Sequence, residues 1–264
     1  MTDATMTHAK PSGTADFRPV VLVPVFNHER AIGAMVDAIL RHPVPCLLID
    51  DGSSERCAAV LRDLAATHAD RVTLIRLDRN QGKGAAVMAG FDAALRAGYT
   101  HALQIDADGQ HDAGCIPAFF DVAQRHPDAI VCGTPVYDAS VPRGRLIGRY
   151  VTHVWVWIHT LSFAIRDSMC GLRVYPLASV VPLVRTQRIG HRMEFDTEVI
   201  VHLVWRGAPV LNIATPVTYP IDGVSHFRMW RDNVRISWMH TRLFFGMLGR
   251  LPTLVARKLA RKLA

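Results

Sequence analysis

The sequence lacks several features that would assign it to common protein classes. Its five cysteines are odd in number and form no C-x-x-C pair, which argues against a disulfide framework or a zinc site and favours reduced thiols in a cytosolic setting. The N-terminal region has no apolar signal-peptide core, and the apolar, aromatic segment 150–165 is too short for a confident transmembrane helix. There is no internal repeat and no low-complexity segment. We therefore expect an ordinary globular domain.

Acidic residues are scarce at the C-terminal end of the sequence. Residues 224–264 contain nine basic residues and a single acid, Asp232, so this segment holds more than the whole formal net charge of +7. Half of the 264 residues are hydrophobic, enough for one sizeable core. We expect a polar, disordered leader at 1–17, one domain at 18–228 and a basic tail at 229–264. Nucleic acid and anionic lipid are the obvious partners of such a tail.

Strand and helix patterns alternate through the first half of the chain. Apolar runs predict buried strands at 20–25, 44–49, 72–77, 100–105 and 129–132. Helical spacing lies between them at 30–40, 58–67 and 80–97. This alternation predicts an α/β fold with a mostly parallel sheet and helices on both faces. After Gly133 the regularity fades, and we expect a loop at 135–149, a helix at 196–205 and a further strand at 209–213.

The most informative stretch is 103–111, where the fourth predicted strand ends in Asp106, Asp108 and Gln110. Open α/β sheets bind ligands beyond the carboxyl ends of their strands, and side chains two residues apart on an extended chain point to the same side. Carboxylate and amide oxygens suit Mg²⁺ or Mn²⁺, which can also hold a diphosphate. The alternative is an acidic loop that caps the next helix, and this motif alone does not decide between the two.

Two other predicted strand ends have weaker motifs. Asp50 and Asp51 follow the second strand, where an acid suits a ribose or a base edge, although a turn with Ser53 or Ser54 as helix cap explains them too. The segment 80–84, Asn-Gln-Gly-Lys-Gly, would bring backbone amides to a phosphate at a helix start. It has neither P-loop nor G-x-G-x-x-G spacing, and close helix–strand packing explains its glycines equally well.

Four motifs in a fixed order resemble one family. They are 23–29 (Val-Pro-Val-Phe-Asn-His-Glu), 49–54 (Ile-Asp-Asp-Gly-Ser-Ser), 80–84, and 106–111 (Asp-Ala-Asp-Gly-Gln-His). Together they closely resemble family 2 glycosyltransferases with the GT-A fold, over roughly residues 18–228. Within that family the chain is most similar to the dolichyl/polyprenyl-phosphate sugar synthase branch. That branch also has motifs like 167–173 (Asp-Ser-Met-Cys-Gly-Leu-Arg) and 194–198 (Glu-Phe-Asp-Thr-Glu).

The resemblance implies roles by position for the donor. The nucleotide sugar would bind at Pro24, Phe26, Glu29, Asp50, Asp51, Gly82, Lys83, Asp106, Ala107 and Asp108. Asp106, Asp108 and Gln110 would hold a Mg²⁺ or Mn²⁺ ion that neutralises the departing nucleoside diphosphate. The family inverts the anomeric centre in a single in-line displacement, so no covalent glycosyl-enzyme is expected.

Two kinds of acceptor stay open. A hydroxyl acceptor must lose a proton to a carboxylate, and the candidates are Asp167, Asp196 and Glu194. A lipid phosphate is already anionic and needs only orientation, which arginine supplies; the resemblance assigns this to Arg143, Arg145, Arg149 and Arg173. The branch usually shows Arg-x-x-Gly-x-Ser-Lys near the end of the domain. This chain lacks that arginine and has Ser225 followed by His226, and both are further acceptor-site candidates.

The end of the tail has the pattern of a basic amphipathic helix. Val255, Leu259 and Leu263 recur every four residues with basic residues between them, as in helices that lie in a membrane interface; a helix packed on the domain is the alternative. We expect a transferase that is peripheral on the inner, cytoplasmic face of the membrane.

Two rival hypotheses have less support in the sequence. A sugar nucleotidyltransferase would need a Gly-rich loop after the first strand, where this chain has Asn27-His28-Glu29. A non-catalytic protein that binds membranes or nucleic acid through its basic tail would not need the intact Asp106, Asp108 and Gln110.

Overall fold

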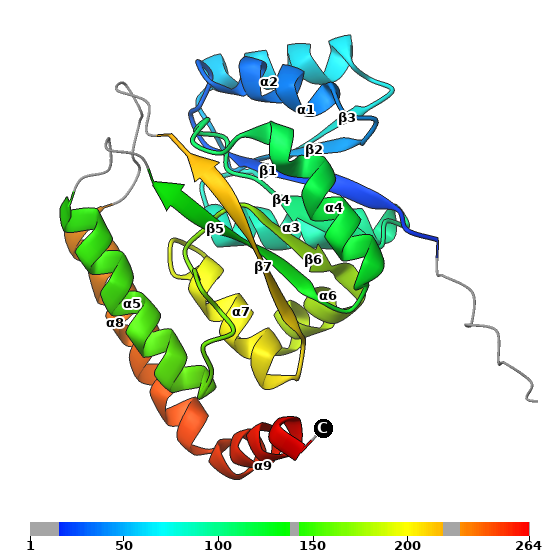
Figure 1. Cartoon of the computed structure of the whole chain (residues 1–264). Helices are drawn as coiled ribbons and strands as arrows, with labels where there is room; N and C mark the ends of the chain where they lie inside the picture. Colours follow the sequence, from blue (N-terminus) through cyan, green and yellow to red (C-terminus); the bar gives the residue numbers. More distant parts are fainter. Residues whose placement is uncertain (1–15, 138–142, 219–227, 264) are drawn as a thin grey trace, which may run out of the picture.

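The computed structural model describes residues 16–137, 143–218 and 228–263 (Figure 1). Ser225 and His226 and nearly all of the expected leader lie outside these residues, so what the sequence predicts for them stays a prediction. The ring of Phe17, the last residue of the expected leader, lies 4.8 Å from the ring of His101 and 6.1 Å from that of Phe120. Phe17 therefore already packs on the domain.

One sheet organises the described part of the chain. Its strands are β1 (Pro19–Val25), β2 (Cys46–Asp50), β3 (Val72–Arg76), β4 (His101–Gln104), β5 (Ile130–Tyr137), β6 (Arg173–Pro176) and β7 (Val210–Val217). Their order is β3-β2-β1-β4-β6-β5-β7. Strand β6 is antiparallel to β4 and β5, and the other pairs are parallel. The predicted α/β fold with a mostly parallel sheet is confirmed.

Helices cover both faces of the sheet (Figure 1). One face packs against α1 (Ile32–Leu40), α2 (Glu55–Thr67) and α4 (Ile116–Arg125), and the other against α3 (Lys83–Arg96), α6 (Leu177–Thr186) and α7 (Phe195–Trp205). Side chains of β1 alternate between the two layers, with Val20 and Leu22 on the α3 side and Val21 and Val23 on the α1 side. Because both faces are covered, the strands are apolar throughout, and this made them readable in the sequence.

The loop expected at 135–149 is wrong. Strand β5 continues to Tyr137, and helix α5 runs from Arg143 to Thr160. Helix α5 has no clean apolar stripe in the sequence, because His159 and Thr160 are buried while Tyr150 and Trp155 are exposed. The short strand β6 was not predicted either, since it has only four residues.

The chain after residue 228 forms two helices, α8 (Met229–Leu248) and α9 (Leu251–Leu263). Helices α5 and α8 run side by side, and we call them the helix pair (Figure 1). At their interface His159 Nε2 lies 3.1 Å from His240 Nδ1. Helix α9 turns back toward α7, where Arg257 Nη1 donates to the Trp205 carbonyl oxygen at 2.7 Å. The expected tail thus begins as a helix packed on the domain.

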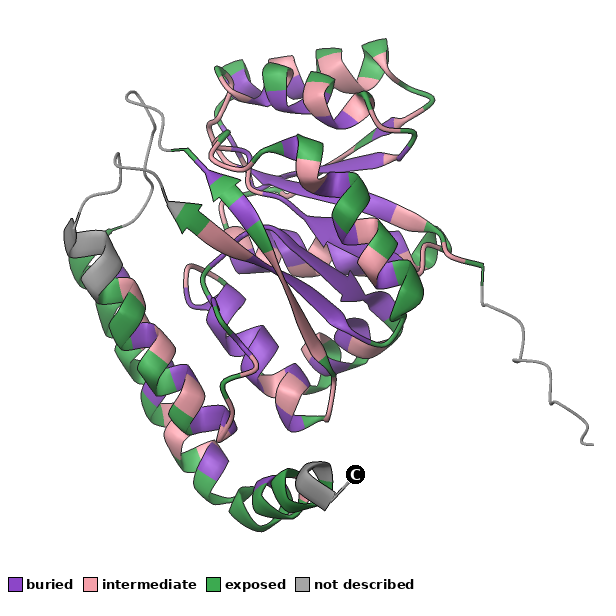
Figure 2. Ribbon diagram, viewed as in Figure 1, coloured by how far each residue is buried: buried purple, intermediate pink, exposed green. Residues whose placement is uncertain are grey.

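Much of the helix pair is exposed (Figure 2), and many of its exposed side chains are apolar. Its exposed hydrophobic side chains are Tyr150, Val151, Val154, Trp155 and Ile158 on α5, and Met229, Trp230, Val234, Trp238, Phe245 and Leu248 on α8. Soluble monomers seldom expose so many apolar groups together. No helix among the described residues is both long and apolar enough to cross a bilayer.

Candidate active site

The loops that follow β1 and β2 are bonded to each other at the carboxyl ends of the strands. Asn27 has a left-handed backbone with φ of 54°, a conformation that asparagine tolerates better than most residues. Its backbone N–H donates to Ser53 Oγ at 3.0 Å, and its side-chain Oδ1 accepts from the Ser54 N–H at 2.8 Å. The two loops therefore form one unit at the edge of the sheet.

The two acids that follow β2 fix neighbouring backbone. Asp50 Oδ2 accepts from Arg76 Nη1 at 3.0 Å. Asp51 accepts from the backbone N–H groups of Gln81 and Gly82 at 2.7 and 2.8 Å. Burial raises the pKa of Asp51, and these two hydrogen bonds oppose that shift. Both acids were predicted to line the nucleotide pocket, and the structure shows that Asp51 holds the loop that opens α3.

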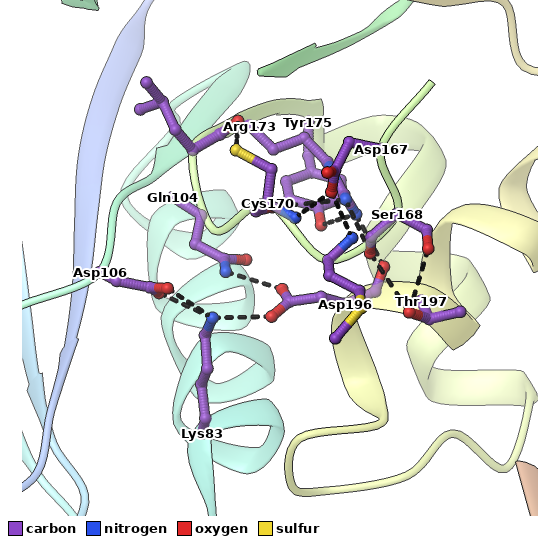
Figure 3. A network of polar contacts seen from close by, with 12 residues as sticks. Lys83, Gln104, Asp106, Asp167, Ser168, Cys170, Arg173, Tyr175, Asp196 and Thr197 are labelled. Atoms are coloured by element: carbon purple, nitrogen blue, oxygen red, sulfur yellow. Dashed lines mark hydrogen bonds and ion pairs between the residues drawn. The ribbon is translucent and has the colours of Figure 1, made fainter. Parts of the chain in front are cut away.

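Lys83 is the first residue of α3 and links two acids from distant parts of the chain (Figure 3). Its Nζ lies 2.7 Å from Asp106 Oδ1 and 2.7 Å from Asp196 Oδ2. The other oxygen of Asp196 accepts from Gln104 Nε2 at 2.8 Å. Burial opposes the charge of Lys83, but Asp106 and Asp196 outweigh burial and raise its pKa. The ammonium group is therefore held permanently charged between the two carboxylates.

The carboxylate of Asp106 lies against the backbone of Gly171. A Cβ atom at position 171 would come within 2.0 Å of Asp106 Oδ2, so any other residue there would displace the carboxylate. Burial raises the pKa of Asp106, but the charge of Lys83 lowers it further and the net direction is down. Asp106 is thus ionised and wedged between Lys83 and the turn that precedes β6.

Asp108 and His111 lie in the loop after β4. Asp108 Oδ1 accepts from the Gln110 N–H at 3.0 Å. Burial and then the charge of Asp106 raise the pKa of Asp108, because two carboxylates in a poorly solvated site repel each other. Burial lowers the pKa of His111, although the charges of Asp106 and Asp108 act to raise it. The buried Nδ1 of His111 has no hydrogen-bond partner among the described residues.

The carboxylates of Asp106 and Asp108 suit a divalent metal that needs few protein ligands. Within the described residues no three His, Cys, Asp or Glu side chains form a closed metal cage. Mg²⁺ does not need one, because it keeps several waters and is bound by one or two carboxylates together with substrate phosphates. A bound cation would also relieve the repulsion that raises the pKa of Asp108. A ligand role for the Gln110 side chain stays a prediction.

Asp167 forms the second charged cluster of the site. Arg149 donates to it from Nε at 2.5 Å and from Nη2 at 2.8 Å, and His153 Nε2 lies 3.4 Å away. The backbone N–H groups of Met169 and Cys170 donate to Asp167 Oδ1, each at 2.8 Å. Burial alone would raise the pKa of Asp167, but the hydrogen bonds from His153 and Arg149 hold it well below its usual range. Asp167 therefore anchors the 167–170 turn to α5.

Arg173 is not available to an acceptor, and that prediction is wrong. The residue is fully buried, and its guanidinium donates to Tyr175 Oη at 2.9 Å and to the carbonyl oxygens of Asp196 and Ser168 at 2.8 and 3.2 Å (Figure 3). It holds the turn before β6 to the start of α7. Arg143 and Arg145 belong to the first turn of α5, and their role at the acceptor stays a prediction.

The remaining predicted residues line the same edge of the sheet. Pro24 and Ala107 are buried at the ends of β1 and after β4, and Phe26 and Glu29 are partly exposed. Glu194 folds back on Gly190 just before α7, where a Cβ at position 190 would lie 2.2 Å from Glu194 Cγ. The buried Oε2 of Glu194 has no hydrogen-bond partner among the described residues.

Comparison with known proteins identifies the family. Residues 20–168 match the model of glycosyl transferase family 2. The chain belongs to this family. It is 27% identical over 246 residues to a polyprenol monophosphomannose synthase of Mycolicibacterium smegmatis, covering 89% of each chain. It is 25% identical over 265 residues to a dolichyl-phosphate β-glucosyltransferase of Dictyostelium discoideum, covering 88% of this chain and 80% of that protein. The predicted family and branch are confirmed, and the protein is a glycosyltransferase.

Two solved structures share the fold of this glycosyltransferase. A glucosyl-3-phosphoglycerate synthase of Mycobacterium tuberculosis superposes with a TM-score of 0.61 at 13% identity, covering 92% of this chain and 85% of that one. A mannosyltransferase of Pyrobaculum calidifontis, solved with GDP-Man and Mn²⁺, gives 0.55 at 18% identity, covering 94% and 75%. The expected GT-A-like architecture is confirmed at the level of fold, and the rival idea of a non-enzyme is set aside.

Sequence reasoning missed three polar residues of this site. Gln104 lies inside β4 and bonds Asp196, His153 faces Asp167 from α5, and His111 is buried beside the two acids. A polar glutamine within an apolar strand was a usable signal for Gln104, since a buried amide needs a partner. No local signal marked His153, because its partner belongs to another segment.

Proposed function

We propose that this glycosyltransferase moves a sugar from a nucleotide-diphosphate donor to a polyprenyl phosphate, with a divalent metal and with inversion at the anomeric carbon. In this reaction an oxygen of the acceptor phosphate forms a bond to the anomeric carbon of the donor sugar. The bond from that carbon to the β-phosphate oxygen breaks at the opposite side, and the nucleoside diphosphate leaves. One in-line step therefore completes the transfer.

The donor diphosphate is best accommodated at Asp106 and Asp108. The observation that supports this most is that Asp106 and Asp108 lie two residues apart after β4, in a poorly solvated site where burial and then the charge of Asp106 raise the pKa of Asp108. Mg²⁺ or Mn²⁺ bound there would supply the positive charge that stabilises the leaving diphosphate. Lys83 keeps Asp106 ionised and in place. The Pyrobaculum calidifontis mannosyltransferase, which has the same fold, was solved with GDP-Man and Mn²⁺, and this similarity favours the same class of donor.

A phosphate acceptor is favoured because two of the three candidate bases already have hydrogen-bond and charge partners within the chain. Asp196 is bonded to Lys83 and Gln104, and Asp167 has its pKa held low by His153 and Arg149. The low pKa makes Asp167 a weak proton acceptor, and both carboxylate oxygens of Asp196 already have hydrogen-bond partners. A polyprenyl phosphate carries its own negative charge and needs no base, in line with what the names of the M. smegmatis and D. discoideum relatives describe.

A hydroxyl acceptor is the second candidate, and one observation favours it. Glu194 Oε2 is buried without a hydrogen-bond partner among the described residues, so this carboxylate oxygen could accept a hydrogen bond from an acceptor hydroxyl. The Glu194→Gln variant separates the candidates. If the acceptor is a phosphate, transfer should fall by less than about tenfold; a loss of about a thousandfold would indicate a hydroxyl acceptor with Glu194 as base.

The exposed face of the helix pair supports peripheral binding to a membrane surface. Aromatic side chains such as Trp230 and Trp238 are of the kind that gathers at the boundary between water and lipid. A lipid-linked acceptor would be reached from that surface. We propose the cytoplasmic side, in keeping with five cysteines that are all free thiols.

The test is a transfer assay over a panel of UDP- and GDP-sugars with Mn²⁺ and with either a short polyprenyl phosphate or the corresponding polyprenol. The proposal expects one donor to give a polyprenyl-phosphate sugar of inverted configuration, and no product from the alcohol. Transfer to the alcohol alone, or undiminished transfer in the presence of a chelator, would contradict it.

A further inference from the structure

A basic trough lies between α7 and α8, away from Asp106 and Asp108. Its volume is about 230 Å³, enough for about seven waters at roughly 30 Å³ each. One wall is the face of α7 that presents Glu198, His202 and Trp205. The other wall is the face of α8 that presents Arg242 and leads to Arg250. Neither the donor chemistry nor the proposed acceptor chemistry uses this trough.

Positive charge is in excess among the residues that line the trough. Arg188, Arg242 and Arg250 face one carboxylate, Glu198. That carboxylate is already satisfied, because Arg242 Nη2 lies 2.9 Å from its Oε1 and the Gly190 N–H donates to its Oε2 at 2.8 Å. The excess charge therefore falls on Arg188 and Arg250.

The side chains of the trough are held in place without filling it. The guanidinium of Arg250 lies 4.6 Å from the centre of the Trp205 ring and donates to the Gly246 carbonyl oxygen at 2.9 Å. Gly246 lets α8 approach that ring, since a Cβ there would come within 2.8 Å of it. Three arginines line this cavity together with one carboxylate, Glu198. A preformed cavity with three guanidinium groups and one satisfied acid points to an anionic ligand.

His202 reports the electric field inside the trough. Burial first, and then the charges of Arg250, Arg242 and Arg206, lower its pKa to about 4. This shift occurs although the Glu198 carboxylate lies only 3.9 Å away. The three arginines thus add to the effect of burial, and an anion in the trough would act in the opposite direction on His202.

We propose that this trough binds a phosphate group, either inorganic phosphate or the head group of an anionic lipid. Arginine matches phosphate oxygens with paired N–H donors. Arg231, Arg235 and Arg242 follow one edge of α8 at spacings of four and seven residues, and Arg242 lines the trough. A lipid phosphate at the membrane surface could enter there. The proposal does not depend on sugar transfer at Asp106 and Asp108.

The test measures phosphate binding to the full chain by NMR, through the imidazole signal of His202 assigned with the His202→Gln variant. Inorganic phosphate and soluble dihexanoyl phosphatidic acid are titrated separately, against sodium chloride of equal ionic strength to control for screening. Binding should raise the pKa of His202. Arg188→Gln and Arg250→Gln should each weaken binding about tenfold, and the exposed Arg125→Gln should leave it unchanged.

The outcomes separate the two sources and the alternatives. Tighter binding of the lipid than of inorganic phosphate identifies a head-group site, and equal binding identifies a free-phosphate site. Asp108→Ala should bind either probe as the wild type does, which distinguishes the trough from the donor site. The proposal would be overturned if His202 responded to neither probe. It would also be overturned if both arginine variants, shown to be folded by circular dichroism, bound the probes as tightly as the wild type does.

Discussion

The edge of the sheet and the helix pair differ in which side chains they bury and which they expose. At the edge, charged groups are buried and find partners within the chain, as Lys83 does between Asp106 and Asp196. On the helix pair, apolar groups such as Trp230 and Trp238 are left exposed. The interior of the pair reverses this pattern, since it buries the polar rings of His159 and His240.

This contrast indicates two different kinds of ligand. Charges that the fold has already fixed and compensated are suited to a polar, multiply charged ligand, because little reorganisation remains when it binds. Apolar surface that the fold has not covered is suited to a partner that excludes water. This family 2 chain therefore combines a polar site with an apolar face, as the proposed reaction between a water-soluble donor and a lipid acceptor would require.

The largest effect is expected at the polar edge. The Asp108→Ala variant should lower kcat/KM for transfer about a thousandfold, because it removes a metal ligand and several kcal/mol of charge stabilisation. Its urea midpoint should stay close to that of the wild type, since within the described residues the Asp108 side chain accepts a hydrogen bond from Gln110 of its own loop. Asp63→Ala on α2 is the matched control, and full activity of Asp108→Ala would refute the metal assignment.

The second effect concerns the ion pair between Arg149 and Asp167, which ties α5 to the 167–170 turn. Arg149→Ala removes the guanidinium that is bonded to the buried Asp167 carboxylate and leaves the His153 imidazole 3.4 Å from it. The variant should lower the free energy of unfolding by about 3 kcal/mol. Urea denaturation measures this, with the exposed Arg125→Ala as control. A change below about 0.5 kcal/mol would show that the Arg149–Asp167 contact adds nothing to stability.

The third effect tests the polar interior of the helix pair with acid. The pKa values of His159 and His240 are lowered to about 4 by burial, so the folded state holds both rings neutral while the unfolded state takes up protons below pH 6.5. Stability should therefore fall as pH drops from about 6.5 toward 4, and the two rings together should cost about 2 kcal/mol between pH 6.5 and pH 5.5. His240→Phe should flatten the pH dependence of stability between pH 6.5 and 5. An unchanged slope would exclude His159 and His240 as the cause of that dependence.

The smallest effect is expected at the apolar face. Replacing Trp230 and Trp238 together by alanine should weaken sedimentation with anionic vesicles about tenfold while leaving the fold intact. The matched control replaces both by phenylalanine, which keeps the apolar bulk and should retain most of the binding. Equal vesicle binding by the alanine variant would mean that this face does not meet the membrane.

Much of the fold was predictable because local patterns specify it. The strands β1 to β4 are mainly apolar segments, and the GT-A-like arrangement follows from their alternation with helices. Helix α5 was missed because its contacts are with other helices, and its burial pattern follows α7 and α8 rather than a simple stripe.

The candidate site was predictable in its members but not in their pairing. The Asp106, Asp108 and Asp51 positions follow from strand ends, whereas the contact between Lys83 and Asp196 joins residues 113 positions apart. Arg173 was assigned to the acceptor because sequence shows charge and not burial. Its place in β6, between β4 and β5, encloses it completely.

The most direct test of the central claim is a titration of Mn²⁺ followed by electron paramagnetic resonance, with GDP or UDP present. We predict one bound Mn²⁺ per chain in the presence of the preferred nucleotide, and none in Asp108→Ala. Mn²⁺ binding that is absent from the wild type with either nucleotide, or unchanged in Asp108→Ala, would contradict a donor diphosphate held through metal at Asp106 and Asp108.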